Sequence, residues 1–234
     1  MLIDVHCHLH EFSNPHKFKE IVIIAVSDDL KSSIKTIKLC ETEKNWIPAI
    51  GIHPWEVKNT RKSALEEIKH LVARHEIKVL GEIGLDKKFV PETWDKQLIF
   101  FKFFLKLANE YNLILNLHSA GAWQEVFNLL VKYDIEKALF HWYTGPLDLL
   151  EKIESKGYFI GINPAITIQE KHKEVAKISK NFITESDGPY KYRGLELNPL
   201  MIKNTIKIIA ELRNESVSKV EKRIEVNFRK YFEF

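Results

Sequence analysis

Few cysteines, glycines and prolines occur in this sequence, and their scarcity excludes several classes of protein. Two cysteines among 234 residues cannot form a disulfide framework, which indicates a reducing, cytoplasmic setting. Nine glycines and eight prolines are too few for a collagen-like or a Pro/Gly-rich disordered chain. No apolar run approaches the ~20 residues of a membrane-spanning helix, and the N-terminal segment lacks the pattern of a secretory signal. We therefore expect no contact with a membrane.

The charge is nearly balanced and gives no sign of a nucleic-acid partner by itself. Lys and Arg number 35 against 32 Asp and Glu, a formal net charge of +3 at pH 7, whereas nucleic-acid-binding domains are often strongly basic. Hydrophobic residues make up 45% of the chain, which is ordinary for a globular protein with a full core. We expect residues 1–234 to form a single domain, and no obligate protein partner is evident.

Short apolar runs alternate with amphipathic stretches along the chain. Eight runs are rich in Ile, Val, Leu or Phe, as strands buried on both faces should be: 2–9, 21–27, 47–54, 78–86, 113–119, 137–145, 158–165 and 182–190. Six stretches resemble helices: 60–76, 93–111, 121–133, 147–156, 200–213 and 217–232. The alternation predicts an α/β fold whose eight βα units close into a TIM-like (β/α)8 barrel. A doubly wound open sheet is the alternative, but the Gly-rich phosphate turn typical of that fold does not occur.

His6 and His8 form the clearest local signal for a metal. Residues i and i+2 of a strand point to the same side, so two imidazoles project together from the first run, as two ligands of one ion must. Asp4 lies on that side as well. A polar strand end with incidental histidines would give the same pattern, and the other polar residues therefore decide between the two interpretations.

Further metal-capable residues occur near the ends of four other apolar runs. They are Glu82 in the fourth run, His118 in the fifth, His141 in the sixth and Asp187 in the eighth. The carboxyl ends of barrel strands converge on one mouth, where barrel enzymes place their active sites. Together with the first-strand histidines, these residues predict a metal centre at that mouth.

The size of this ligand set suggests two ions. A single tetrahedral catalytic site uses three protein ligands and keeps one position open, and six side chains exceed that number. The expected arrangement has His6, His8 and Asp187 on one ion, His118 and His141 on the other, and Glu82 between them. Mixed histidine and carboxylate ligands suit divalent ions such as Mg, Mn or Zn. Two such ions can activate a bridging water, with Asp187 as the general base.

Several short motifs accompany these residues in order along the chain. They are His6-x-His8, Gly51-Ile52-His53-Pro54, Gly81-Glu82-Ile83-Gly84-Leu85-Asp86, His118, His141 with Gly145, Glu185-x-Asp187-x-Pro189-Tyr190, Arg193-Gly194, Asn198-Pro199 and Asn227-x-x-x-x-Phe232. Together they resemble the TatD family of metal-dependent hydrolases and deoxyribonucleases, within the amidohydrolase superfamily. The resemblance implies a TIM-like barrel, two divalent metals on the six predicted ligands, and phosphodiester hydrolysis, often as a 3′-to-5′ exonuclease.

The chain departs from the usual pattern of that family at three places near the predicted mouth. Ala120 stands where an Arg usually follows the third ligand histidine by two residues. Trp142 and Tyr143 follow the fourth, where a small residue or Cys and then Phe are usual, and Gly161 replaces a Ser. The usual Arg would help to hold an anionic substrate, so its loss leaves the choice of substrate open.

Three residues are predicted to bind substrate. His53 ends the third apolar run and could contact a scissile phosphate, although the following proline could also fix it as a structural histidine. Residues 189–193 interleave aromatic and basic side chains, as a single-strand binding edge does. There Tyr190 would stack on a base and Arg193 would bind phosphate, while a solvated loop would show the same pattern. Glu185 is a candidate to orient a ligand histidine.

The remaining histidines and the first cysteine have no predicted role in the site. His10, His16, His70, His75 and His172 are expected on the surface or in loops. Cys7 alternates with the ligand histidines and should be a small buried hydrophobic residue.

The leading interpretation is a TatD-type deoxyribonuclease that acts on DNA, at single strands or 3′ ends. The alternative keeps the binuclear metal site but cleaves a small ester, lactone or amide, as amidohydrolase relatives do, because a fold does not fix a function. A nucleic-acid-binding or assembly protein with a vestigial site is a third possibility. It is disfavoured because a relic would be expected to lose at least one of the six ligands.

Overall fold

Eight parallel β-strands form one sheet in the computed structural model, which describes residues 1–232. The strands are β1 (Ile3–Cys7), β2 (Val22–Ala25), β3 (Trp46–Ile50), β4 (Val79–Gly84), β5 (Ile114–His118), β6 (Ala138–Phe140), β7 (Phe159–Ile162) and β8 (Phe182–Thr184), and a hairpin of β9 (Lys191–Tyr192) and β10 (Leu195–Glu196) follows them. They neighbour one another in sequence order. Beyond β8, the Asp187 backbone N–H donates to the His6 carbonyl at 2.9 Å, so the last strand returns to the first and the barrel nearly closes. The TIM-like α/β barrel is confirmed, and the doubly wound sheet is ruled out.

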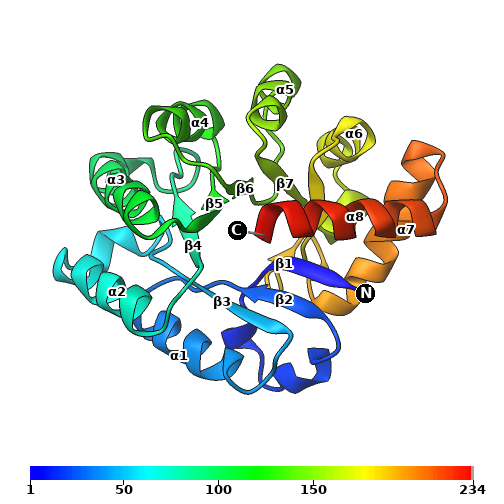
Figure 1. The fold of residues 1–234 in the computed structure, drawn as a ribbon. Helices are drawn as coiled ribbons and strands as arrows, with labels where there is room; N and C mark the ends of the chain where they lie inside the picture. Colours follow the sequence, from blue (N-terminus) through cyan, green and yellow to red (C-terminus); the bar gives the residue numbers. More distant parts are fainter. Residues whose placement is uncertain (233–234) are drawn as a thin grey trace.

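Helices α1 to α7 lie around the outside of the ring of strands, and α8 crosses in front of the ring, as Figure 1 shows. They are α1 (Leu30–Cys40), α2 (Ser63–Arg74), α3 (Trp94–Tyr111), α4 (Trp123–Lys132), α5 (Leu147–Ser155), α6 (Glu170–Ile178), α7 (Ile202–Arg213) and α8 (Val217–Phe232). Six of them match the predicted stretches, whereas α1 and α6 were not predicted. The start of α1 does carry a capping box, because Asp29 accepts from the Ser32 N–H at 2.7 Å and the Ser32 hydroxyl accepts from the Asp29 N–H at 2.8 Å.

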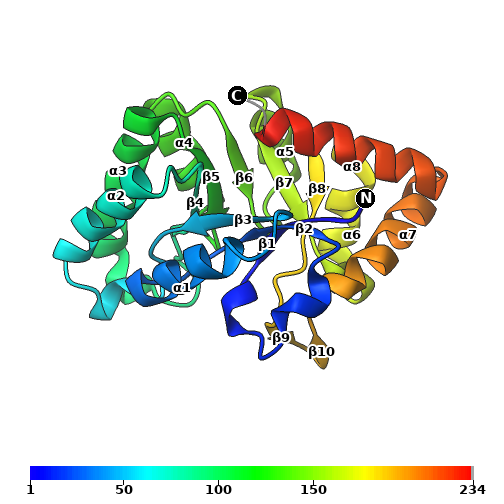
Figure 2. The same cartoon turned by 60° about the horizontal axis from the view of Figure 1, so that its bottom comes forward.

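The two ends of the barrel are covered differently. Helix α8 crosses the end at which the strands begin, where the Tyr231 hydroxyl donates to the Leu115 carbonyl at 3.2 Å and the Asn227 amide donates to the Phe182 carbonyl at 2.9 Å. The hairpin of residues 191–196 lies at the opposite end, as Figure 2 shows. The carboxyl ends of the strands therefore face away from α8, and the hairpin stands at their rim.

The strand residues are buried on both faces, as the apolar runs predicted. Every residue of β1 and β4 is buried, because the core fills the barrel on one side and the helices cover the other. Cys7 is fully buried beside Leu9 and Phe18, which confirms it as a small buried hydrophobic residue. Cys7 and Cys40 are both free thiols. Among residues 1–232, no helix has the length and apolarity needed to cross a bilayer.

Two histidines that were expected on the surface are buried, so that prediction was wrong for them. His172 in α6 is fully buried, and its Nε2 accepts from the Asn163 backbone N–H at 3.0 Å. His10 is 7% exposed, with its Nδ1 3.2 Å from the Val26 carbonyl. The burial of these histidines could not be predicted, because each lies in a polar segment and its burial depends on how that segment packs against the barrel.

Candidate metal centre

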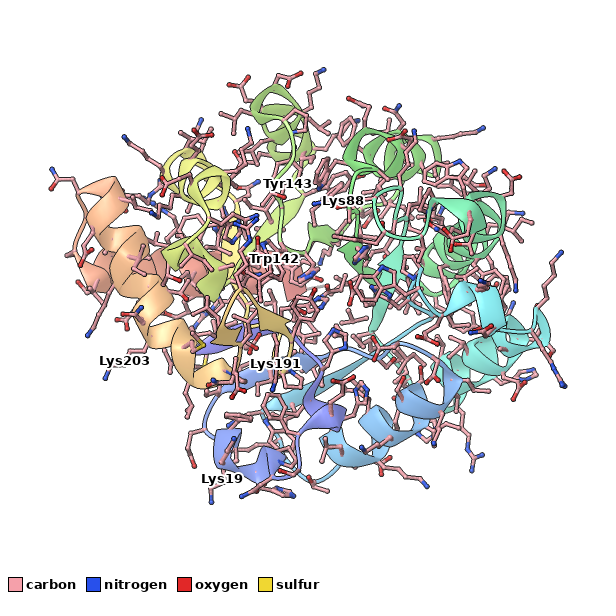
Figure 3. All side chains as sticks on the ribbon, turned by 180° about the vertical axis from the view of Figure 1, so that it is seen from behind. Lys19, Lys88, Trp142, Tyr143, Lys191 and Lys203 are labelled. Carbon is pink, nitrogen blue, oxygen red and sulfur yellow. The ribbon has the colours of Figure 1, made fainter. Side chains whose placement is uncertain are left out.

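The six predicted ligands gather at the carboxyl ends of the strands. Each lies near the carboxyl end of β1, β4, β5, β6 or β8, or within the three residues that follow the strand. The set is His6, His8, Glu82, His118, His141 and Asp187. Five of them line one cavity of about 630 Å³, and His6 lies fully buried beneath it. Figure 3 views the molecule from this side, with Trp142 near the centre of the face. The barrel therefore brings together residues that are up to 181 positions apart in the sequence.

Glu82 lies at the centre of this cluster. Its Oε2 is 3.2 Å from His6 Nε2 and 3.3 Å from His8 Nε2. Its Oε1 is 2.8 Å from His118 Nδ1 and 3.2 Å from His53 Nε2. The two carboxylate oxygens thus face two separate sets of imidazole nitrogens, which is the arrangement of a carboxylate that can serve two ions at once.

Asp187 faces the first of these sets from the segment that follows β8, the neighbour of β1 in the barrel. Its Oδ1 is 3.6 Å from His6 Nε2 and 3.5 Å from His8 Nε2, and its Oδ2 is 4.0 Å from His141 Nε2. The His6 and His141 rings stack with centroids 3.7 Å apart, while the His118 and His141 centroids are 6.5 Å apart. The nearest groupings thus place His141 with His6 and Asp187, rather than with His118 as expected.

The second set contains a residue that was predicted only to bind substrate. His53 Nε2 is 3.1 Å from His118 Nδ1, and both face Glu82. His53, Glu82 and His118 form one of the groups in this protein whose ligand atoms lie close enough to hold a metal ion. His53 is 7% exposed, so it belongs to the floor of the cavity and not to its rim.

The chemistry of the donor set fits a divalent cation. The His6 Nδ1–H donates to Asn116 Oδ1 at 2.7 Å, and the Asn116 amide is itself fixed because it donates to the Val5 carbonyl at 2.6 Å. The other ring nitrogen, His6 Nε2, is buried and has no hydrogen bond among the described residues. It faces carboxylate oxygens of Glu82 and Asp187, so a bare lone pair there would be repelled. This nitrogen must therefore carry a proton or bind a cation, and a metal ion can take the place of the proton.

Each predicted ligand histidine has an oxygen acceptor beside its other ring nitrogen. The pairs are His6 Nδ1 with Asn116 Oδ1 at 2.7 Å, His8 Nδ1 with Asp28 Oδ1 at 3.1 Å, His118 Nε2 with Asp86 Oδ2 at 2.9 Å, and His141 Nδ1 with Glu185 Oε1 at 3.1 Å. Metal-binding histidines almost always have such a partner, which fixes the ring and its tautomer. The position of Glu185 agrees with its predicted orienting role.

Asp28 and Asn116 were missed by the sequence analysis. Both had a signal: Asp28 directly follows the second strand run, and Asn116 is a polar residue inside an apolar strand, two residues before His118. Residues two apart point to the same side of a strand. The identity of their partners could not be predicted, because His8 and His6 reach them only through the pairing of separate strands.

Two glycines provide the space that the site needs. Gly84 has φ +146°, and a Cβ there would lie 1.9 Å from the His118 carbonyl oxygen, so only glycine lets β4 approach β5 at the ligand histidine. A Cβ at Gly161 would lie 1.8 Å from Glu185 Oε2. The loss of the family's usual Ser at this position therefore makes room for the Glu185 carboxyl group behind His141.

The electrostatics of the cluster favour positive charge near Glu82. Burial raises the pKa of Glu82, but His53 and His6 lower it more, and the net pKa lies well below the ordinary value. Burial lowers the pKa of His6, yet Glu82 and Asp187 raise it to about 9. His118 has a pKa of about 9 as well, because hydrogen bonds to Asp86 and Glu82 outweigh its burial. The carboxylates therefore hold protons on these histidines that a metal ion would replace.

The three predicted substrate-binding residues lie in different places. His53 is part of the floor, and Tyr190, which is 43% exposed, lines the rim of the cavity. Arg193 is not among the described residues that line the cavity; its guanidinium carbon lies 5.3 Å from the ring centroid of Tyr192, in the turn of the hairpin. Ala120 lines the cavity, and Lys31, Lys35 and Lys88 supply positive charge around it.

Comparison with known proteins finds relatives over nearly the whole chain. A family model described as TatD related DNase matches residues 3–233. An uncharacterised metal-dependent hydrolase of Methanocaldococcus jannaschii is 29% identical, over 98% of this chain and 96% of its own. The metal-dependent hydrolase YabD of Bacillus subtilis is 25% identical, over 99% of each chain.

Solved structures show the same fold. The TatD homologue YjjV of Escherichia coli superposes with a TM-score of 0.91 at 23% identity, over 100% of this chain and 98% of its own. The phosphotriesterase homology protein of Escherichia coli, solved with phosphate in its active site, gives a TM-score of 0.72 at 13% identity, over 99% and 98% of the two chains.

Proposed function

Because this chain belongs to the TatD family of metal-dependent hydrolases, we propose that it is a deoxyribonuclease that removes nucleotides from the 3′ ends of DNA. The observation that carries the proposal is the position of Glu82, whose two oxygens face two sets of imidazole nitrogens at the floor of an open cavity. Such a centre suits two divalent ions, Mg, Mn or Zn, and the barrel would act as one domain around it.

The residues of the chain would divide the work as follows. Bound divalent ions supply charge neutralisation at a phosphate and lower the pKa of a coordinated water. His6, His8, His118, His141, Glu82 and Asp187 would hold them. Asp187 would accept the proton of the attacking water at its carboxylate, and His53 would donate to a phosphate oxygen.

The surroundings of the centre support an anionic substrate. Lys31, Lys35 and Lys88 line the cavity and would pair with phosphate groups at its rim, while bound divalent ions would offset the carboxylates that also line it: Glu11, Asp28, Asp29, Glu56, Glu82 and Asp187. The lysines would also supply positive charge in place of the Arg that is usual at the position of Ala120. The structural similarity to a protein that carries phosphate in its active site is consistent with this assignment.

A second candidate keeps the same centre and cleaves a small ester, lactone or amide. Ala120 favours it, because a methyl group in the cavity lining offers no partner to a phosphate. Fold similarity to the dihydroorotase of Campylobacter jejuni, with a TM-score of 0.60 at 16% identity over 100% of this chain and 83% of its own, is in line with it. We place it second because the family model that matches the chain is described as TatD related DNase.

A cytoplasmic location remains part of the proposal. Its support is the pair of buried free thiols, Cys7 and Cys40, which suit a reducing compartment. Detection of the protein in the soluble cell extract, against a periplasmic or secreted fraction, tests it.

Cleavage of labelled DNA tests the proposed activity. A single-stranded oligonucleotide with a 5′ fluorophore is incubated with the protein in Mg or Mn and, separately, in EDTA. We expect a ladder that shortens from the 3′ end only with metal, and no ladder with Glu82→Gln. Glu110→Gln is the matched control, because Glu110 is an exposed partner of Lys69 far from the cavity. Cleavage by Glu82→Gln, or none by the wild type in any metal, would overturn the proposal.

A further inference from the structure

Two groups of aromatic rings stand on different sides of the cavity. The first, here the Trp142 wall, consists of Trp142, Tyr190 and Tyr192; the Trp142 ring centroid lies 4.9 Å from that of Tyr192 and 6.1 Å from that of Tyr190. The second, here the Trp55 wall, consists of Trp55 and Phe89, with centroids 5.8 Å apart. All five residues line the cavity.

Each wall adjoins one of the ligand histidines. The Trp142 centroid is 6.1 Å from that of His141, and the Trp55 centroid is 6.2 Å from that of His118. The two histidine rings are 6.5 Å apart. A phosphodiester group placed over the centre would therefore have an aromatic wall next to it on both sides.

The two indoles are held in place by their N–H groups. The Trp142 Nε1–H donates to Gln169 Oε1 at 2.9 Å, and the Trp55 Nε1–H donates to Asp86 Oδ2 at 2.6 Å. Trp142 also has a φ of +42°, and its backbone N–H donates to Glu185 Oε1 at 2.8 Å. A left-handed conformation is unfavourable for a residue with a bulky side chain. The strand end thus fixes the indole beside His141, at the lining of the cavity.

Three of these five rings are exposed to solvent, and Trp142 and Tyr192 are partly buried. Trp55 is 41% exposed, Phe89 56% and Tyr190 43%. Core packing does not account for their position, since none of the three belongs to the buried core. Lys88 adds charge next to the Trp55 wall, with its Nζ 4.9 Å from the Phe89 centroid. Aromatic faces beside a cation are the surface on which single-stranded nucleic acids stack their bases.

We propose that each wall stacks one unpaired nucleobase, so that the two bases on either side of the scissile phosphate are both bound and a dinucleotide is the smallest efficient substrate. This rests on the proposed function and names its substrate: single-stranded ends with two adjacent bases. Trp142 and Trp55 then determine specificity, because they bind the parts of the substrate that do not react.

A set of four thymidine dinucleotides tests the inference. The first carries both bases. The second and third lack one base each, because a tetrahydrofuran abasic sugar replaces the 5′ or the 3′ nucleoside. The fourth has abasic sugars at both positions and carries no base. We expect kcat/KM of the wild type to fall about 5- to 150-fold for each missing base, which corresponds to the ~1–3 kcal/mol of one base–aromatic stack. Since this comparison uses only the wild-type protein, it does not depend on the folding of any variant.

Variants then assign each base to its wall. In Trp142→Ala, removal of one of the two bases should no longer lower kcat/KM. In Trp55→Ala, removal of the other base should no longer lower it. Trp142→Phe and Trp55→Phe keep a ring and should keep most of the base dependence. Tyr111→Ala is the matched control, since Tyr111 is 37% exposed at the end of α3 and lies outside the cavity lining.

The outcomes separate the inference from the proposed function. Equal cleavage of all four dinucleotides would overturn the two-wall inference and leave the nuclease activity standing. Base dependence that survives unchanged in both Ala variants would also overturn it. If the protein cleaves neither the dinucleotides nor longer DNA, the proposed function is overturned, and the inference with it.

Discussion

The role of Asp28 provides a sharp test, because this residue was not foreseen and lies beside His8 without being one of the six predicted ligands. Its Oδ1 lies 3.1 Å from His8 Nδ1, and its Oδ2 lies 3.3 Å from His10 Nε2. Burial raises the pKa of Asp28, but His8 and His10 lower it well below the ordinary value, so its carboxylate is charged in the folded protein. Asp28 therefore orients the His8 ring and makes its Nε2 a stronger ligand for a metal ion.

Asp28→Asn keeps the shape of the side chain and removes its charge. Loss of such a partner of a metal ligand costs about 10- to 100-fold in metal affinity, or ~1.4–2.7 kcal/mol. The assay is competition with a fluorescent chelator for Mn or Zn, with Asp148→Asn, an exposed carboxylate on α5, as the matched control. A change below about twofold in Asp28→Asn, in protein that melts like the wild type, would refute the reasoning.

Three further predictions follow from the same contacts. In the metal-free protein the pKa values of His6 and His118 are both about 9, so at pH 7 each holds a proton that an ion must displace. Metal affinity should therefore rise with pH, by up to about tenfold per pH unit for each proton displaced, and level off above about pH 9; a flat titration from pH 7 to 9 would contradict this. Gly84→Ala should lower the free energy of unfolding by about 3 kcal/mol or more, because its Cβ would lie 1.9 Å from the His118 carbonyl oxygen. Gly157→Ala, which has φ +80° and open space around it, should cost only about 1 kcal/mol in the same urea titration, and equal losses would argue against the clash. Gly161→Ser should displace Glu185 and weaken metal binding at His141, and unchanged binding of both ions by calorimetry would argue against that role.

The architecture was predictable because buried parallel strands leave a strong signal. Eight apolar runs at regular spacing predict eight strands, and the carboxyl-end rule then places His118 and Asp187 in the same site. Helix α6 was not predicted for a local reason. Most of its nine residues are Lys, Glu or small side chains, so its apolar face is short. Its buried His172 shows that burial depends on tertiary packing and not on the local pattern.

The finer geometry of the site could not be predicted from spacing. Periodicity gives the face of a strand but not which histidine of one strand meets which carboxylate of another. That is why His118 was expected beside His141, whereas the barrel brings it next to His53. Similarly, the basic character of residues 189–193 suggested Arg193 as a phosphate contact, but the hairpin turn directs its guanidinium onto Tyr192.

The central claim is that Glu82 lies between two divalent ions, and anomalous diffraction from Mn-loaded crystals tests it most directly. We predict two anomalous peaks, one near Glu82 Oε2 with His6 and His8, and the other near Glu82 Oε1 with His118. A single peak, or peaks that leave the Glu82 carboxylate without a metal contact, would contradict it.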